Sequence, residues 1–272
     1  MVPFNYWVLR LCRRVTPQRI VDFILDRGIC LKPGKETSTP QTVAGLYAEW
    51  AGKYGHRLEG STVCVAGFGG GFGVGVYLLE RGARRVILQD PYAPVRSRRN
   101  RHIPVELIGR YFRKKDGDWV PNGVQLVHVR QDLPSYSFEN PESADIVFSR
   151  SVLEHVVDAE AVVAACARLT RMGGLNIHLI NLQDHVFAYP FEMLCYSKRT
   201  WDKWLNPGSN LNRLRTQDYA AIFRRHFSSM DVTIVESLKE EFHRVRSRIR
   251  PEFLTGDDEI DSAAIIRIDA RK

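Results

Sequence analysis

The alternation of short apolar runs with amphipathic stretches, from residue 61 onward, constrains the fold more than any other feature of the chain. Runs typical of strands cover residues 62–66, 86–88, 124–129, 146–148 and 175–180. Helical stretches at about 72–81, 103–114 and 158–171 separate most of them. Parallel neighbouring strands need crossover connections of this kind. We therefore expect a mostly parallel sheet with helices on both faces.

The two ends of the chain depart from this pattern. Met230–Val235 and Ala263–Ile268 read as strands joined by a polar, arginine-rich segment at about 240–260, which suits an antiparallel pair better than another crossover. The first sixty residues read as helical, with helices opening at Thr16-Pro17 and Thr39-Pro40. The predicted fold class is α/β: a Rossmann-like doubly wound sheet of about seven strands, mostly parallel with an antiparallel C-terminal strand.

Charge and composition limit the kinds of binding partner and the cellular compartment that we expect. The 272 residues include 39 basic and 31 acidic side chains, for a net charge of +8. This charge favours an anionic partner, and equally fits a surface that is only solubilising. Five cysteines without a C-x-x-C pair indicate reduced thiols, and no metal ligand set is predicted. No stretch approaches the roughly 18 apolar residues of a membrane span, and the apolar N-terminus precedes its arginines, so we expect a cytoplasmic protein.

The strongest motif is a glycine-rich turn that directly follows the first predicted strand. Six of the nine residues 67–75 are glycines. Glycine is needed where the backbone turns sharply or approaches a ligand closely, and the helix that follows offers unpaired N–H groups. Neither G-x-G-x-x-G nor a phosphate-binding G-x-x-x-x-G-K-[ST] is present, whereas G-x-G-x-G is, at Gly67, Gly69 and Gly71. The alternative is a tight turn with packing glycines.

A carboxylate follows the next predicted strand. Asp90 ends the run Val86-Ile87-Leu88-Gln89, where an acid can accept both hydroxyls of a ribose. The glycine turn and Asp90 together predict a nucleoside-containing cofactor at the carboxyl ends of the strands.

At this point the chain resembles the class I S-adenosylmethionine-dependent methyltransferases, in particular bacterial members of the methyltransferase type 11 kind. The resemblance continues through Asp132-Leu133-Pro134, then Asp145 to Val156, which includes Leu153-Glu154-His155, and then Leu169-Thr170-Arg171-Met172-Gly173-Gly174. These blocks occur in family order over about residues 61–181.

The resemblance implies roles for individual positions, with S-adenosyl-L-methionine as cofactor. Gly67, Gly69 and Gly71, with Phe68, would line the methionine moiety. Asp90, followed by Pro91, would hold the ribose, and Asp132 and Leu133 would lie near the adenine. The floor below the sulfonium would be formed by Ser149, Arg150 and Ser151. Asp132 could instead only terminate a strand, and Ser149 could only satisfy loop backbone.

One position departs from the family pattern. Many members carry an acidic residue two positions before the first glycine, where this chain has Val65. The substitution leaves open a catalytically degenerate member that only binds or regulates.

Asp184-His185 follows the fifth predicted strand, where acceptor would meet cofactor. Methyl transfer needs alignment of the reactants, and an oxygen nucleophile also needs a base. We expect His185, oriented by Asp184, to be that base, with His155 as the second candidate. The alternative is that the pair forms a structural turn.

The segment that follows, about 184–218, looks like a substrate-side insertion. It is rich in aromatic residues, and its Arg213 and Arg215 could pair with phosphate or carboxylate. An equally good interpretation of Trp201 and Trp204 is that they form the core of a packing subdomain. We expect residues 1–58 to form N-terminal helices capping the site and residues 59–272 to form the methyltransferase domain.

The sequence therefore predicts an O-methyltransferase acting on a small-molecule, sugar or glycan-like acceptor, which could be anionic. A nucleic-acid methyltransferase is disfavoured, because the chain has no D/N-P-P-Y/F motif. The basic N-terminal helix, with Arg10, Arg13 and Arg14, suits either peripheral membrane contact or docking on the domain's own flank. The oligomeric state and the acceptor atom are not determined by the sequence.

Overall fold

The structure is a computed structural model that describes residues 4–17, 38–92, 100, 103–186, 188–206 and 210–272. The helix expected from Thr16-Pro17 lies mostly outside these ranges. No helix within them is both long enough and apolar enough to cross a membrane.

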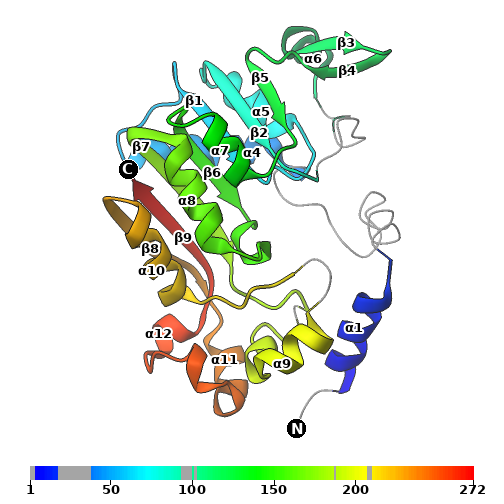
Figure 1. Ribbon diagram of the computed structural model, residues 1–272, viewed down its shortest axis with the longest axis vertical. Coiled ribbons are helices and arrows are strands. Elements are labelled where there is room, and N and C mark those ends of the chain that lie inside the picture. Colours follow the sequence, from blue (N-terminus) through cyan, green and yellow to red (C-terminus); the bar gives the residue numbers. More distant parts are fainter. Residues whose placement is uncertain (1–3, 18–37, 93–99, 101–102, 187, 207–209) are drawn as a thin grey trace.

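A sheet of seven strands organises the molecule (Figure 1). Its strands, in chain order, are β1 Thr62–Ala66, β2 Arg85–Gln89, β5 Leu126–Val129, β6 Ala144–Arg150, β7 Thr170–Asn181, β8 Ser229–Ser237 and β9 Ala263–Arg271. They lie in the order β5-β2-β1-β6-β7-β9-β8. The pairs from β5 to β7 are parallel, and β9 runs antiparallel to both β7 and β8. The predicted fold class is confirmed.

Helices cover both faces of the sheet because its central strands are apolar on both sides. Val63 and Val65 of β1 pack with the helices α4 (Pro40–Lys53) and α5 (Gly73–Leu79), whereas Cys64 and Ala66 face the opposite core. That second core includes α7 (Leu133–Glu139), α8 (Ala159–Leu169) and α10 (Thr216–His226). Burial on both faces is what a doubly wound parallel sheet requires.

A third apolar cluster lies beyond the end of the sheet. It joins α1 (Phe4–Val15), the segment after β7 and α11 (Lys239–Val245) through Tyr6, Phe191, Trp201 and Phe242. The segment after β7 contains η3 (Glu192–Cys195), α9 (Lys198–Thr200) and η4 (Trp201–Leu205). Figure 1 shows α1 beside α9, far along the chain from it but close in space.

The remaining short elements complete the connections. They are α6 (Val105–Tyr111), the antiparallel strands β3 (Phe112–Lys115) and β4 (Asp118–Pro121), η2 (Leu153–His155), η5 (Arg246–Arg248), η6 (Pro251–Phe253) and α12 (Asp258–Asp261). The helix predicted over 103–114 is therefore shorter than expected, because it begins at Val105 and its last three residues belong to β3. The expected division at residue 58 stays a prediction; α1 and α4 contact different cores.

Candidate functional site

The loop after β1 presses its backbone against the loop after β6. Gly67 and Gly69 have φ of 67° and 71°, a region that side chains rarely adopt, and Gly70 follows at 85°. A Cβ placed on Gly67 would lie 2.3 Å from Cγ2 of Val152. Because β1 and β6 are neighbours whose loops leave the sheet at its switch point, this contact lies where doubly wound folds bind ligands.

Phe68 contributes backbone rather than side chain to this loop. Its ring is fully buried, stacked on Phe72 at 5.6 Å between centroids and edge-on to His128 at 5.4 Å. The aromatic side chain therefore anchors the turn from beneath.

Asp90 lies directly opposite the glycine loop. Its Oδ2 accepts a hydrogen bond from the backbone N–H of Gly69 at 3.1 Å, and its Oδ1 accepts one from Tyr92 at 2.9 Å. The Asp90 N–H donates to the Val129 carbonyl at 2.9 Å, which continues the ladder from β2 to β5. The carboxylate that follows β2, ahead of Pro91, is thus aimed at the turn after β1.

Asp132 and Leu133 begin α7 at the next strand end. The carboxylate of Asp132 accepts the Ser135 N–H at 2.9 Å and caps the helix. That hydrogen bond, which favours the charged form, lowers the pKa of Asp132. The Leu133 side chain is buried against the α8 face of the sheet.

The three residues expected below the sulfonium point in different directions. Ser149 is buried within β6, and its hydroxyl hydrogen-bonds Nδ1 of His178 on β7 at 2.7 Å. Arg150 ends the strand half-buried, and Ser151 is exposed with a φ of 51°. The backbone N–H of Ser151 donates to the Leu179 carbonyl at 2.9 Å.

His155 and His185 meet beside this loop. Their ring centroids are 4.8 Å apart, and the buried carboxylate of Glu154 belongs to the same group. Burial, followed by the proximity of His155 and of Arg10, lowers the pKa of His185 to about 4. The ring of His185 is therefore neutral at pH 7. Sequence reasoning placed both histidines near the acceptor but did not single out Glu154, although it precedes His155 directly.

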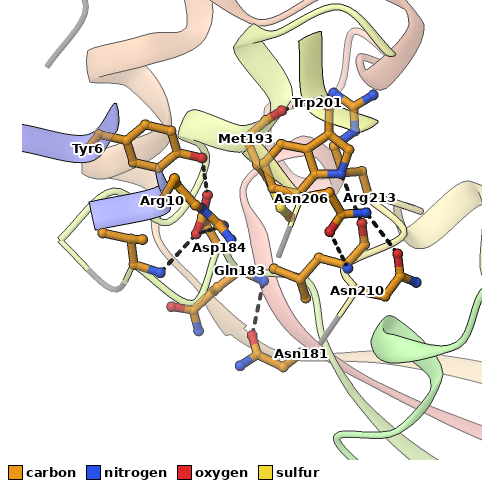
Figure 2. A network of polar contacts seen from close by, with 12 residues as sticks. Tyr6, Arg10, Asn181, Gln183, Asp184, Met193, Trp201, Asn206, Asn210 and Arg213 are labelled. Atoms are coloured by element: carbon orange, nitrogen blue, oxygen red, sulfur yellow. Dashed lines mark hydrogen bonds and ion pairs between the residues drawn. The ribbon is translucent and has the colours of Figure 1, made fainter. Parts of the chain in front are cut away.

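Asp184 anchors the N-terminal helix. It accepts hydrogen bonds from the Tyr6 hydroxyl at 2.5 Å and from the backbone of Val186 at 2.8 Å, and it forms a buried ion pair with Arg10 (Figure 2). Figure 2 shows Tyr6 and Arg10 reaching it from α1. Burial raises the pKa of Asp184. These contacts bind its carboxylate to α1 and to the backbone of Val186, and its expected role in orienting His185 stays a prediction.

The two arginines of the insertion donate hydrogen bonds to backbone carbonyls. Arg213 donates to the carbonyls of Met193 and Tyr196, and Arg215 donates to those of Leu182, Asp261 and Ala263. Both side chains are buried, at 7% and 1% exposure. The expected pairing with phosphate or carboxylate is therefore wrong: Arg213 joins two parts of the insertion, and Arg215 fastens the insertion to residues at the ends of β7 and β9. Trp201 is likewise core, whereas Trp204 is half exposed.

The geometry fits a nucleoside cofactor at the β1 and β2 strand ends. The bare backbone of the glycine loop allows close approach, and the Asp90 carboxylate beside Gly69 is the acceptor that a ribose requires. Val65, in place of the usual acid, is buried in the sheet.

Comparisons with known proteins find a methyltransferase domain in this chain. Residues 66–177 match the family model described as a methyltransferase domain. The chain is 28% identical over 169 residues to the ubiquinone biosynthesis O-methyltransferase of Hahella chejuensis, covering 59% of this chain and 63% of that protein. It is 38% identical over 53 residues to the enzyme of the same name from Klebsiella pneumoniae subsp. pneumoniae, covering 20% of this chain and 22% of that one. The chain thus spans less than two thirds of the length of either relative.

The fold is also shared with a solved structure. A Galdieria sulphuraria protein, assigned in its crystal structure to a sarcosine dimethylglycine methyltransferase, superimposes with a TM-score of 0.50 at 13% identity, covering 84% of each chain. The sheet order, the glycine turn and the acid after β2 agree with the family match: residues 66–177 form a class I S-adenosylmethionine-dependent methyltransferase domain, the family whose cofactor is S-adenosyl-L-methionine.

Proposed function

We propose that the protein transfers a methyl group from S-adenosylmethionine to a hydroxyl of a small-molecule acceptor. The observation that carries the proposal is the Asp90 carboxylate held against the Gly69 N–H at the switch point of the sheet. When bound, the cofactor supplies an electrophilic methyl carbon on a positively charged sulfur. The chain itself must then bind, align and exclude water.

Each part of the site has a share in that alignment. Asp90 accepts the ribose hydroxyls, and the backbone from Gly67 to Gly69 leaves room for the methionine end. The loop at Ser151 and Val152 closes against this turn from β6. The acceptor lies beyond it, beside His155 and His185, and loses its proton at this histidine pair.

Transfer to oxygen, rather than to nitrogen, is supported by two features. Both curated relatives described above are named as O-methyltransferases. Two imidazoles whose ring centroids lie 4.8 Å apart are also a suitable place for a hydroxyl to lose its proton. A sugar or glycan-like acceptor remains within the proposal. Arg213 and Arg215 no longer support an anionic acceptor, because both guanidinium groups bind backbone carbonyls.

Calorimetry with S-adenosylmethionine tests the cofactor site. Replacing Asp90 by Asn removes charge-assisted hydrogen bonds worth about 1.5–3 kcal/mol, so we expect cofactor affinity to fall roughly 10- to 100-fold. Glu240→Gln makes the same charge change at an exposed position on α11 and should leave the affinity unchanged. Equal affinities for Asp90→Asn and the parent protein would refute the ribose assignment.

Product formation tests the enzyme against a binding-only member. Labelled cofactor is incubated with the protein and a cell extract, and the labelled small molecule is identified. Transfer to a metabolite that disappears in the His185→Ala variant supports the proposal. Tight cofactor binding without any labelled product would favour the degenerate alternative that Val65 suggests.

We also propose that α1 lets the protein contact an anionic membrane surface. One side of the helix faces the insertion, yet Phe4, Leu9 and Val15 are 82%, 52% and 78% exposed, and the chain carries a net charge of +8. Sedimentation with phosphatidylglycerol vesicles should therefore exceed that with neutral vesicles, and Phe4→Ser should reduce it. A cytoplasmic location is part of this proposal, supported by the free thiols of the described cysteines.

A further inference from the structure

Three side chains able to bind a metal converge next to, but outside, the cofactor loop. Glu154 and His155 come from η2, and His185 comes from the loop after β7. One ligand atom from each lies within 4.8 Å of the others. Glu154 is 3% exposed and the two histidines are half-buried, so the group is sheltered while still open on one side.

The orientation of His155 is fixed by a backbone carbonyl. Its Nδ1 lies 2.9 Å from the Asn210 oxygen, and because a carbonyl can only accept, Nδ1 carries the proton. The lone pair is therefore on Nε2. The Asn210 amide in turn donates to the His155 carbonyl at 3.1 Å, and Asn206 donates to the Asn210 side chain at 2.8 Å (Figure 2). An imidazole held by such an outer hydrogen bond is the usual arrangement around a metal ligand.

The carboxylate of Glu154 is held in the same way. Its Oε1 accepts the Asn181 N–H at 3.3 Å, and its backbone carbonyl accepts the Asn212 N–H at 3.0 Å. The nearby positive charge of Arg10 is matched by its buried ion pair with Asp184. The buried carboxylate of Glu154 lies within 4.8 Å of ligand atoms of the two histidines.

We propose that Glu154, His155 and His185 bind a divalent first-row transition cation of the zinc class. Two imidazoles and one carboxylate form the donor set of zinc sites that keep a position open for substrate. Magnesium and calcium are disfavoured, because they prefer oxygen ligands alone.

The cation deepens the proposed function, on which its role rests. The group begins two residues after Val152, whose side chain lies against Gly67, so the group lies near the glycine loop of the proposed cofactor site. A cation there lowers the pKa of an acceptor hydroxyl. With the cation bound, the two histidines are its ligands, so the hydroxyl proton passes to water instead of to an imidazole. In the transfer the acceptor oxygen bonds to the methyl carbon, and the carbon–sulfur bond breaks with its electrons staying on sulfur.

Binding can be tested without any methyl transfer. The full chain is stripped with a chelator and titrated with Co²⁺, followed by visible absorption and competition with Zn²⁺. We expect one equivalent to bind. His185→Ala and Glu154→Gln should each lose more affinity than the roughly 10- to 100-fold that loss of an outer partner costs. The exposed His243→Ala is the matched control and should bind as the parent does.

Cofactor calorimetry on the same variants shows that they are folded. Unchanged Co²⁺ affinity in both His185→Ala and Glu154→Gln, or no stoichiometric binding by the parent, would overturn the cation site. If the site binds cobalt but transfer is undiminished after chelation, the cation has no part in the reaction and the histidines act directly. Failure of cofactor binding with intact cobalt binding would refute the proposed function alone.

Discussion

Gly67 shows how strictly one residue can be constrained. Its φ of 67° and the 2.3 Å approach to Val152 impose two separate penalties on any side chain. We expect Gly67→Ala to lower the free energy of unfolding by about 1–3 kcal/mol, since both left-handed strain and a displaced loop contribute. Cofactor affinity should fall as well, because the displaced loop carries Ser151. Chemical denaturation and calorimetry measure the two effects.

The two penalties can be separated with matched variants. Gly55→Ala has a φ of 76° but open space around the new methyl, so it should show only the conformational cost, about 1 kcal/mol. Val152→Ala removes the colliding methyl groups and should recover part of the loss when combined with Gly67→Ala. A double variant no better than Gly67→Ala alone would show that the contact between the two loops is not the cause.

At this scale the sequence predicts backbone-driven positions better than side-chain directions. Gly67 and Asp90 could be predicted because a sharp turn and a strand-end acid leave a local signature. Ser149 and His178 could not, because their pairing depends on the register between β6 and β7. Glu154 could have been proposed because it adjoins His155, but its burial against β7 depends on the tertiary structure and has no local sequence signal.

At the scale of elements, α1 is held by a buried charge pair. Arg10 is 2% exposed and Asp184 is fully buried, so removing the guanidinium leaves an uncompensated carboxylate. Removing one partner of a buried ion pair typically lowers the free energy of global unfolding by about 3–5 kcal/mol. Here we expect Arg10→Ala to release α1 first. Hydrogen exchange should then rise across residues 4–15.

The neighbouring arginine provides the control for that prediction. Arg14 is exposed on the same helix, so Arg14→Ala removes the same charge without touching Asp184. Its exchange pattern should match that of the parent. Equal protection of α1 in Arg10→Ala and Arg14→Ala would contradict the anchoring role of the pair.

Elements differ in how far they could be predicted. The strand β1 matches its expected bounds because five consecutive buried residues, four of them apolar, fill a position covered on both faces of the sheet. The hairpin of β3 and β4 was missed although Asp116-Gly117, with φ of 50° and 84°, carries a hairpin turn signal. The contact of α1 with the insertion joins residues more than 170 positions apart, so no local pattern reports it.

At the scale of the whole molecule, two apolar cores press on one sheet, and His178 lies inside one of them. It occupies β7 between β6 and β9, with its ring 5.1 Å from that of Phe223 on α10. Complete burial lowers the pKa of His178 to about 3. Its protonation is therefore coupled to global unfolding.

The sign of this coupling follows from the proton balance. Above about pH 6.5 the His178 ring is neutral in both the folded and the unfolded protein. Below that pH the unfolded chain binds a proton at His178, whereas the buried ring of the folded protein stays neutral. Stability is thus lost as the pH falls from about 6.5 toward 3. Between pH 7 and pH 5 this residue alone should remove about 2 kcal/mol.

Urea unfolding at pH 7 and pH 5 isolates that contribution. His178→Gln keeps a polar partner for Ser149 but cannot titrate, so its stability should fall by about 2 kcal/mol less over this interval than the parent's. Ser149→Ala retains the histidine and should lose stability at both values without a change in the pH dependence. The same pH dependence in His178→Gln and the parent would mean that the native sheet admits the charged ring, and that the core around β7 is less closed than its packing indicates.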